Sequence, residues 1–270
     1  MKDSKAGIDL VIIDIDDTFV YHRTVGIANT LFVDAFYQSF SQKKPKKRFY
    51  RTSEMVVEIL SFPFRPKKKI KTDRKRIHDL WKLAKTGIKL YLIHSFRSFV
   101  NLFGARVSNE RLIRLWSKTV IELKVDKRDY ELRKEDIKDY INQKMMHIYC
   151  DLRRNNPRMK VVAITEHFNV DGDLLSKILG ADEIISNRFV FGKDGKITDS
   201  KISVKNADDK KRHATKVYYK YNPKSVALII EDYDDLGLLK MRCLSHVIYK
   251  RRLWPYLPKK NKIITKGFGW

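Results

Sequence analysis

Three carboxylates and a hydroxyl close a short apolar run near the start of the chain, where residues 11–18 read Val-Ile-Ile-Asp-Ile-Asp-Asp-Thr. A β-branched run bounded by polar residues is typical of a buried strand. Asp14 and Asp16 follow that strand, at the edge where open α/β sheets hold their ligands. Because neighbouring carboxylates repel one another unless a cation holds them, the segment fits a Mg²⁺ site with one carboxylate free to act as a nucleophile. A strand followed by an acid-rich turn or helix cap is the structural alternative.

Two later strand ends carry side chains of related chemistry. Residues 160–165 are an apolar run that ends on a hydroxyl, and residues 227–232 are another that ends on two acids, with Asp235 close behind. Between these runs lies the basic start of a helix, with Lys210 and Lys211. Each feature alone is compatible with a helix cap or a solvated lysine. Their order along the chain is more specific: a carboxylate pair, a hydroxyl, a lysine and an acid pair.

This order of motifs resembles the haloacid dehalogenase superfamily of phosphotransferases. The resemblance covers the first strand and the last two-fifths of the chain and leaves the middle unassigned. It implies that Asp14 is the nucleophile that takes the phosphoryl group and that Asp16 is the general acid and base. Thr18 completes the Asp-x-Asp-x-Thr spacing as a substrate-side residue, and Thr165 would hold a phosphoryl oxygen.

The resemblance also requires a lysine that neutralises the aspartyl-phosphate. Lys210 and Lys211 are both candidates. We slightly prefer Lys211, because Ala214 and Tyr218 then lie at i+3 and i+7 on the same side of the predicted helix.

The implied cofactor is Mg²⁺, bound by Asp14, Asp16 (through its backbone carbonyl) and Asp232, with Asp235 supporting these ligands. A phosphoryl group in transfer spreads its charge over three oxygens, so catalysis depends on positioning and cation stabilisation. A carboxylate that attacks a phosphate needs Mg²⁺ and a lysine to cancel the repulsion. A second carboxylate beside the first can stay protonated through burial and like-charge coupling, and can then serve as the acid.

Within the superfamily, the segment after the second motif looks most like the phosphoserine-phosphatase branch, which carries a helical cap between its first two motifs. Two departures bear on the substrate. Arg23 stands nine residues after Asp14, where those enzymes carry a glutamate that binds the substrate amine; an arginine would repel an ammonium and welcome a further anion. Glu166 and Glu231 stand where small residues are usual, so Glu166 must turn away from the phosphate or join the metal ligands. A catalytically inactive binding module on the same fold is the alternative.

The elements that must position these residues predict an α/β fold: a Rossmann-like parallel sheet core with a large, mainly α-helical cap insertion. We expect residues 1–22 and 155–250 to form the core, residues 23–154 a basic helical cap, and residues 251–270 a basic-aromatic tail. The expected elements are strands at about 9–15, 160–165, 183–185, 225–230 and 246–249, helices at 171–180, 209–221 and 234–242, and a hairpin that joins 188–190 to 196–197.

The net charge of +25 is unevenly placed. Residues 41–76 hold fourteen Lys or Arg against three acids, and residues 250–270 hold seven against none. Such a field favours polyanions: a phosphorylated substrate, an anionic membrane surface or nucleic acid. A lysine-rich surface with no polyanionic partner, on a soluble metabolite phosphatase, is the alternative. The apolar stripe in residues 90–103 fits either a helix in a membrane interface or the buried face of a helical domain.

Composition excludes several classes of protein. Hydrophobic residues make up 43% of the chain, which is a globular composition. The two cysteines, Cys150 and Cys243, are too few for a disulfide framework and suit a reducing compartment. No apolar stretch reaches the ~18 residues of a transmembrane helix, and the first strand begins too early to leave room for a signal peptide. We therefore expect a cytoplasmic enzyme, either free or peripheral at the inner membrane surface, and its oligomeric state stays open.

Overall fold

The computed structural model describes residues 7–15, 18–20, 27, 29–33, 36, 52–61, 74–102, 109–130, 138–169, 174–257 and 264–268. The chain divides into two compact units. Unit 1 comprises residues 1–21, 140–188 and 201–270, and unit 2 comprises residues 22–139 and 189–200.

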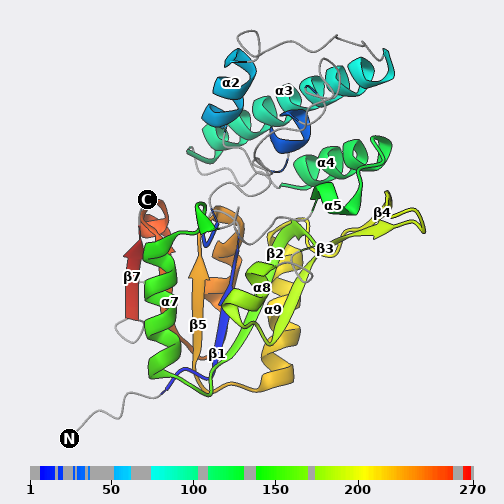
Figure 1. Ribbon diagram of the computed structural model, residues 1–270. Helices are drawn as coiled ribbons and strands as arrows, with labels where there is room; N and C mark the ends of the chain where they lie inside the picture. Colours follow the sequence, from blue (N-terminus) through cyan, green and yellow to red (C-terminus); the bar gives the residue numbers. More distant parts are fainter. Residues whose placement is uncertain are drawn as a thin grey trace, which may run out of the picture. The chain divides into compact units, whose positions relative to one another are not determined.

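A seven-stranded sheet runs through the fold in the order β4-β3-β2-β1-β5-β6-β7 (Figure 1). Its strands are β1 (Leu10–Ile13), β2 (Lys160–Phe168), β3 (Glu183–Phe191), β4 (Ile197–Lys201), β5 (Val226–Ile230), β6 (Leu244–Lys250) and β7 (Ile264–Phe268). The central strand β1 pairs in parallel with β2 on one side and with β5 on the other. All residues of β1 and β5 are buried, as expected for parallel strands that are covered on both faces.

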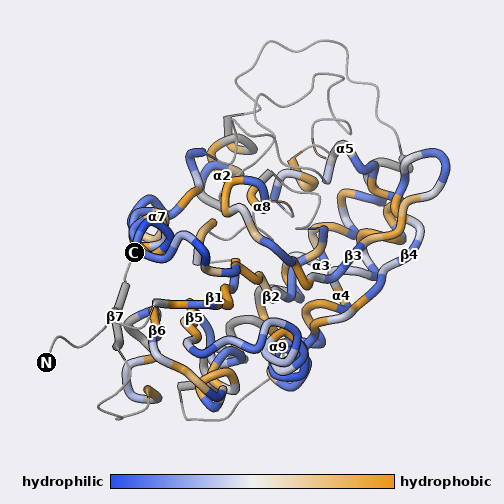
Figure 2. The backbone as a smooth tube through the Cα atoms, turned by 90° about the horizontal axis from the view of Figure 1, so that it is seen from below, coloured by the Kyte–Doolittle hydropathy of each residue, from blue (hydrophilic) through white to orange (hydrophobic). Residues whose placement is uncertain are grey.

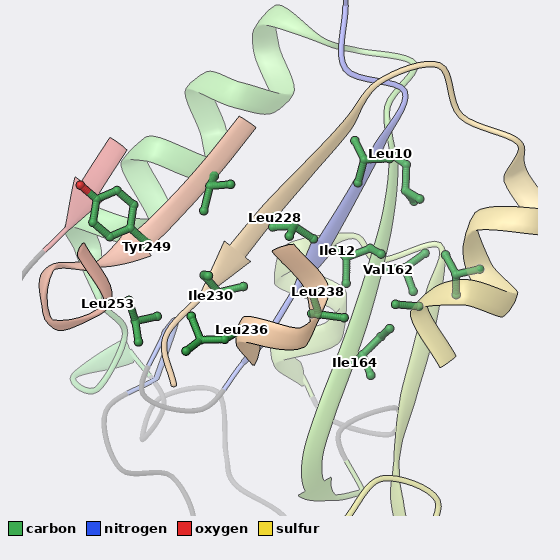
Figure 3. Packing of buried hydrophobic residues seen from close by; sticks show 14 of the residues in the cluster. Leu10, Ile12, Val162, Ile164, Leu228, Ile230, Leu236, Leu238, Tyr249 and Leu253 are labelled. Carbon is green, nitrogen blue, oxygen red and sulfur yellow. The ribbon is translucent and has the colours of Figure 1, made fainter. Parts of the chain in front are cut away.

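Helices cover the sheet of unit 1. They are α7 (Gln143–Asn155), α8 (Leu174–Leu179), α9 (Ala207–Tyr221) and two 3₁₀ helices, η2 (Tyr233–Lys240) and η3 (Arg251–Tyr256). On one face, alternate residues of β1, β2 and β5 form one buried cluster with side chains of α9 and η2, and Figure 3 shows Ile12, Val162 and Leu228 within it. The hydrophobic colour of Figure 2 accordingly gathers on β1 and β5, and hydrophilic colour on α7 and α9.

Helix α7 belongs to unit 1, because its buried side chains pack within that unit. The Tyr149 ring meets Phe19 edge-on, with ring centroids 5.5 Å apart, and its hydroxyl donates a hydrogen bond to the carbonyl of Leu179. The side chain of Asn142 caps the first turn by accepting from the backbone N–H of Met145. The division between the units therefore falls at residues 139 and 140, ahead of this helix, whereas the sequence led us to expect it after residue 154.

Unit 2 is mainly helical. Its described helices are α2 (Thr52–Ser61), α3 (Arg74–Leu102), α4 (Glu110–Glu122) and α5 (Lys127–Tyr130). Helices α3 and α4 pack together and share a buried hydrogen bond between the hydroxyls of Thr86 and Thr119. The tip of the β3–β4 hairpin also belongs to this unit, where Phe189 meets the Tyr130 ring edge-on at 5.0 Å.

The predicted α/β architecture with a parallel sheet and an inserted helical region is confirmed, but several element bounds differ. Strand β2 runs three residues beyond the predicted end, through Phe168. The predicted strand at 183–185 and the first arm of the hairpin are one continuous strand, β3. The predicted helix at 234–242 is the 3₁₀ helix η2. Part of the predicted tail forms η3 and the edge strand β7, which pairs in parallel with β6.

Candidate active site

Strand register brings the three predicted motif ends to one level of the sheet. Ile13, the last residue of β1, pairs with Ala163 of β2 and with Ile229 of β5. Asp14 follows directly, and its backbone N–H donates to the carbonyl of Ile229 at 3.2 Å. Thr165 and Glu231 therefore lie just beyond the residues that flank Asp14. The carboxyl ends of these parallel strands form one polar edge, as an open α/β sheet predicts.

Helix α9 carries both candidate lysines, Lys210 and Lys211. The helix begins at Asn206, whose side chain accepts from the backbone N–H of Asp209. This start sets the helical phase, so Lys210, Ala214 and Val217 lie at i, i+4 and i+7 and form the buried face. Lys211 is exposed. The geometry thus reverses our preference for Lys211 and favours Lys210.

The Lys210 ammonium lies between two buried carboxylates. Its Nζ is 2.7 Å from Oδ1 of Asp235 and 3.8 Å from Oδ2 of Asp14. The other oxygen of Asp235 accepts the backbone N–H groups of Glu231 and Asp232, both at 3.1 Å. Asp235 therefore holds Lys210 and the loop after β5 in one arrangement. The resemblance implies that Asp235 supports the metal ligands, and that role stays a prediction beside this observed contact with Lys210.

Asn187 on β3 positions the approach to α9, and nothing in the sequence had singled it out. Its side-chain amide donates to the carbonyls of Glu166 and Val204, and its side-chain oxygen accepts from the backbone N–H groups of Ser203 and Val204. The side chain is fully buried and makes four hydrogen bonds. These hydrogen bonds connect the end of β2 to the segment that leads into α9, and so they position Lys210 relative to the strand ends. A lone asparagine in a strand carries no sequence pattern that would have revealed this.

Burial and neighbouring acids raise the pKa of Asp14 well above its ordinary value. Burial is the main cause, the Lys210 ammonium opposes it, and the charges of Asp235, Glu231 and Glu166 add to it. The pKa of Lys210 is also raised: its burial alone would lower the pKa, but the carboxylates of Asp14 and Asp235 outweigh that effect. Lys210 therefore remains an ammonium. A cation bound near Asp14 would lower the pKa of Asp14 and favour the carboxylate form of that side chain.

We predict that Asp14→Asn stabilises the metal-free protein at alkaline pH. A buried acid with a raised pKa destabilises the fold as pH rises above the ordinary value for aspartate, and an amide carries no such penalty. We therefore expect the variant to be more stable than the native chain at about pH 8, and the difference to be smaller at about pH 5. Urea unfolding in EDTA at both pH values measures the difference. A variant that is less stable than the native chain at both pH values would contradict the idea that ionised Asp14 destabilises the fold.

The two threonines with predicted roles, Thr18 and Thr165, are both buried. Thr18 is fully buried, and within the described part of the chain its hydroxyl oxygen has no hydrogen-bond partner. The Thr165 hydroxyl accepts the backbone N–H of His167 at 3.3 Å, which leaves its own proton available for a phosphoryl oxygen. Glu166 is buried, and its charge acts on both Asp14 and Lys210. Two other candidates, Asp16 and Arg23, lie outside the described residues.

The buried residues fit a divalent cation. With every group ionised, the carboxylates of Asp14, Asp235, Glu231 and Glu166 outnumber the ammonium groups of Lys210 and Lys250 and leave a formal charge of −2. Oδ1 of Asp14 is buried and makes no hydrogen bond to the described residues. No three acidic, His or Cys side chains of the described ranges converge as a metal cage. Mg²⁺ does not require one, since it is commonly held by one or two carboxylates with water and substrate phosphate.

Of the two acids that follow β5, Glu231 and not Asp232 is among the largest electrostatic influences on the pKa of Asp14. Glu231 is buried, and its charge acts on Asp14. Asp232 is instead the N-cap of η2, where its side chain accepts the backbone N–H of Tyr233 at 2.7 Å. This is the capping role that the sequence offered as the alternative for Asp232.

Comparison with known proteins supports the fold. No protein-family model and no curated protein matches the chain. Among solved structures, a phospho-aspartyl intermediate analogue of phosphoserine phosphatase matches with a TM-score of 0.55 and 14% identity, over 96% of this chain and 93% of the other. A HAD family hydrolase from Salmonella enterica serovar Typhi matches with a TM-score of 0.52 and 11% identity, over 93% and 66%.

A probable phosphoserine phosphatase from Vibrio cholerae matches with a TM-score of 0.51 and 12% identity. The match covers 92% of this chain but only 58% of that one. At these identities the similarity establishes the fold alone. Structural neighbours over most of the chain are thus phosphoserine phosphatases and haloacid dehalogenase hydrolases, and the resemblance predicted from the sequence is confirmed at the level of the fold.

Proposed function

We propose that this chain, which has the fold of the haloacid dehalogenase hydrolases, is a Mg²⁺-dependent phosphatase that hydrolyses a phosphate monoester through an aspartyl-phosphate on Asp14. One observation carries the proposal: the buried Asp14 carboxylate at the end of β1 lies 3.8 Å from the buried Lys210 ammonium, which Asp235 holds at 2.7 Å. A nucleophilic carboxylate paired with a fixed cation is what attack on a phosphate dianion needs.

In the proposed reaction, an oxygen of Asp14 forms a bond to phosphorus while the bond from phosphorus to the leaving oxygen breaks. Asp16 gives its proton to the leaving oxygen and then accepts a proton from the water that hydrolyses the aspartyl-phosphate. The hydroxyls of Thr18 and Thr165 and the ammonium of Lys210 hold the phosphoryl oxygens. Asp14 and Glu231 would hold Mg²⁺, together with the backbone carbonyl of Asp16. When bound, the ion would supply positive charge to offset the repulsion between carboxylate and phosphate.

For the substrate, we propose a phosphate monoester that carries further negative charge, such as a phospholipid headgroup. Arg23, nine residues after Asp14, favours a second anion over the amine of phosphoserine. The net charge of +25 favours the same class. Sugar bisphosphates and nucleotides with a second phosphate group belong to that class too, and a substrate panel distinguishes them.

A substrate panel tests this proposal. The native chain would be assayed for phosphate release from an aryl phosphate, phosphoserine, sugar phosphates, nucleotides and a phospholipid-phosphate dispersed in detergent, with Mg²⁺ and with EDTA. We expect release that depends on Mg²⁺ and is weakest for phosphoserine. A chain that is inert on the whole panel yet binds polyanions would be the decayed binding module instead.

We also predict that Lys250→Met destabilises the protein and that Mg²⁺ restores part of the loss. Lys250 Nζ is 2.7 Å from Oε1 of Glu231, and both side chains are largely buried. Removing one partner of such a pair costs about 3 kcal/mol, because the remaining charge stays buried. Mg²⁺ bound at Glu231 would replace the lost ammonium charge.

The matched control is Lys220→Met. Lys220 pairs with Glu183 at a similar separation, 2.6 Å, but its side chain is 58% exposed. We expect this control to lose much less stability than Lys250→Met, because water and salt screen an exposed pair. Thermal unfolding with Mg²⁺ and with EDTA compares the two variants. Equal responses of the two variants to Mg²⁺ would argue against a cation at Glu231.

A further inference from the structure

Helix α3 of unit 2 carries a row of large apolar side chains in contact with solvent. We call this row the α3 stripe: Trp81, Ile88, Leu92 and Phe96, each at least 60% exposed. Spacings of seven, four and four residues place them on one side of the helix. Lys85 and Lys89, both exposed, lie along the same side. For residues 90–103, which include Leu92 and Phe96, the sequence left open whether the apolar side chains face a core or an interface, and the exposed stripe favours an interface.

The stripe does not hold the helix in its own unit. The contacts of α3 with α4 come from another side of the helix, where Leu83 and Thr86 are buried and Thr86 hydrogen-bonds to Thr119. Lys82 forms an ion pair with Glu122 of α4. Helix α3 therefore has a packed side and a second apolar side that the described part of the unit does not cover. A row of four exposed large apolar side chains on one side of a helix favours an interaction site there.

We propose that the α3 stripe docks on an anionic lipid bilayer, with the helix lying in the headgroup region and the stripe turned toward the acyl chains. Tryptophan and other large apolar side chains partition into this boundary, while adjacent lysines attract anionic headgroups. The helix carries seven Lys or Arg against one acid, so its charge complements such a surface. Within the described residues no helix is long and apolar enough to cross a bilayer, so the contact is with the surface.

Other occupants fit less well. A second copy of the chain would bring two strongly basic helices together, and like charges would oppose that contact. Single-stranded nucleic acid would use Trp81 and Phe96 for stacking and the lysines for phosphates, but Ile88 and Leu92 would have no role. The bilayer uses every member of the stripe and both lysines. The proposal needs no phosphatase chemistry, so it stands or falls independently of the proposed function.

Co-sedimentation with vesicles tests the proposal. The full chain would be mixed with vesicles of phosphatidylcholine alone or of equal parts phosphatidylcholine and phosphatidylglycerol. We expect binding to the anionic vesicles, little binding to the neutral ones, and roughly a tenfold or greater loss of affinity for the double variant Leu92→Glu/Phe96→Glu. Lys216→Gln/Lys224→Gln is the matched control, since it lowers the net charge by the same amount at two exposed lysines of unit 1 and should change affinity far less.

Two further measurements keep the outcome decisive. Hydrolysis of a soluble aryl phosphate and the circular dichroism spectrum should be the same for the double variant and the native chain, and Leu92→Ala/Phe96→Ala serves if the charged variant does not fold. Acyl chains brominated near the interface should quench the native fluorescence more than that of Trp81→Phe. Unchanged vesicle binding by the double variant would overturn the proposal. So would a stripe-dependent dimer in analytical ultracentrifugation, or stripe-dependent binding of single-stranded DNA without vesicle binding.

Discussion

Replacing Asp14 by asparagine is expected to abolish Mg²⁺-dependent phosphate release from an aryl phosphate. The amide keeps the size of the side chain but removes the oxygen nucleophile that would form the bond to phosphorus. Loss of the nucleophile in a covalent mechanism lowers kcat by about 10⁴-fold or more. The effect should appear in kcat, because the Lys210 ammonium and the Thr18 and Thr165 hydroxyls that would hold the phosphoryl group are unchanged.

The matched control is Asp208→Asn, the same chemical change at an exposed acid in the first turn of α9. It should leave kcat within about twofold of the native value. Unfolding in urea identifies any general loss of structure, and Asp14→Asn is expected to be at least as stable as the native chain. If Asp14→Asn kept native activity, the aspartyl-phosphate route would be excluded. If the native chain and Asp14→Asn were both inert, the chain would have the fold of these enzymes without their reaction.

The sequence was informative wherever a continuous apolar run meets a polar residue. The runs that became β1, β2 and β5 are buried on both faces, so their composition alone predicts neighbouring parallel strands. Parallel register then requires the residues after these runs to meet at one edge, which is why Asp14 and Thr165 could be placed together in advance. Strand β7 was missed because Ile264–Phe268 is short, contains a glycine and a lysine, and lies in a strongly basic segment.

Choices between adjacent residues were harder, because they depend on where an element begins. The N-cap at Asn206 sets the phase of α9 and turns Lys210 inward instead of Lys211. The end of β5 at Ile230 leaves Glu231 buried and Asp232 as a helix cap. At the start of α9 and at the end of β5, moving the element boundary by one residue would exchange the buried residue with its exposed or capping neighbour. Predicted element bounds are uncertain by more than that.

The second large effect is expected at Lys210. Lys210→Met removes the cation that would offset the phosphoryl charge, and we expect about a 10²–10³-fold loss of kcat, the range seen when one stabilising group is deleted from an oxyanion site. Lys211→Met is the matched control: it is the same substitution one residue further along α9, at an exposed position, and should leave kcat nearly unchanged. Steady-state hydrolysis of the aryl phosphate compares the two. A large loss for Lys211→Met alone would reverse the assignment.

Lys210→Met also leaves the carboxylates of Asp14 and Asp235 buried without their shared ammonium, so low activity could reflect a damaged fold. The double variant Asp14→Asn/Lys210→Met separates the two causes. Asp14→Asn should add more stability in the Lys210→Met background than it adds to the native chain, because the two charges interact directly. Activity should not recover, since the nucleophile is also gone. If the change in unfolding free energy of the double variant equalled the sum of the two single changes, Asp14 and Lys210 would not interact across the 3.8 Å between Asp14 Oδ2 and Lys210 Nζ.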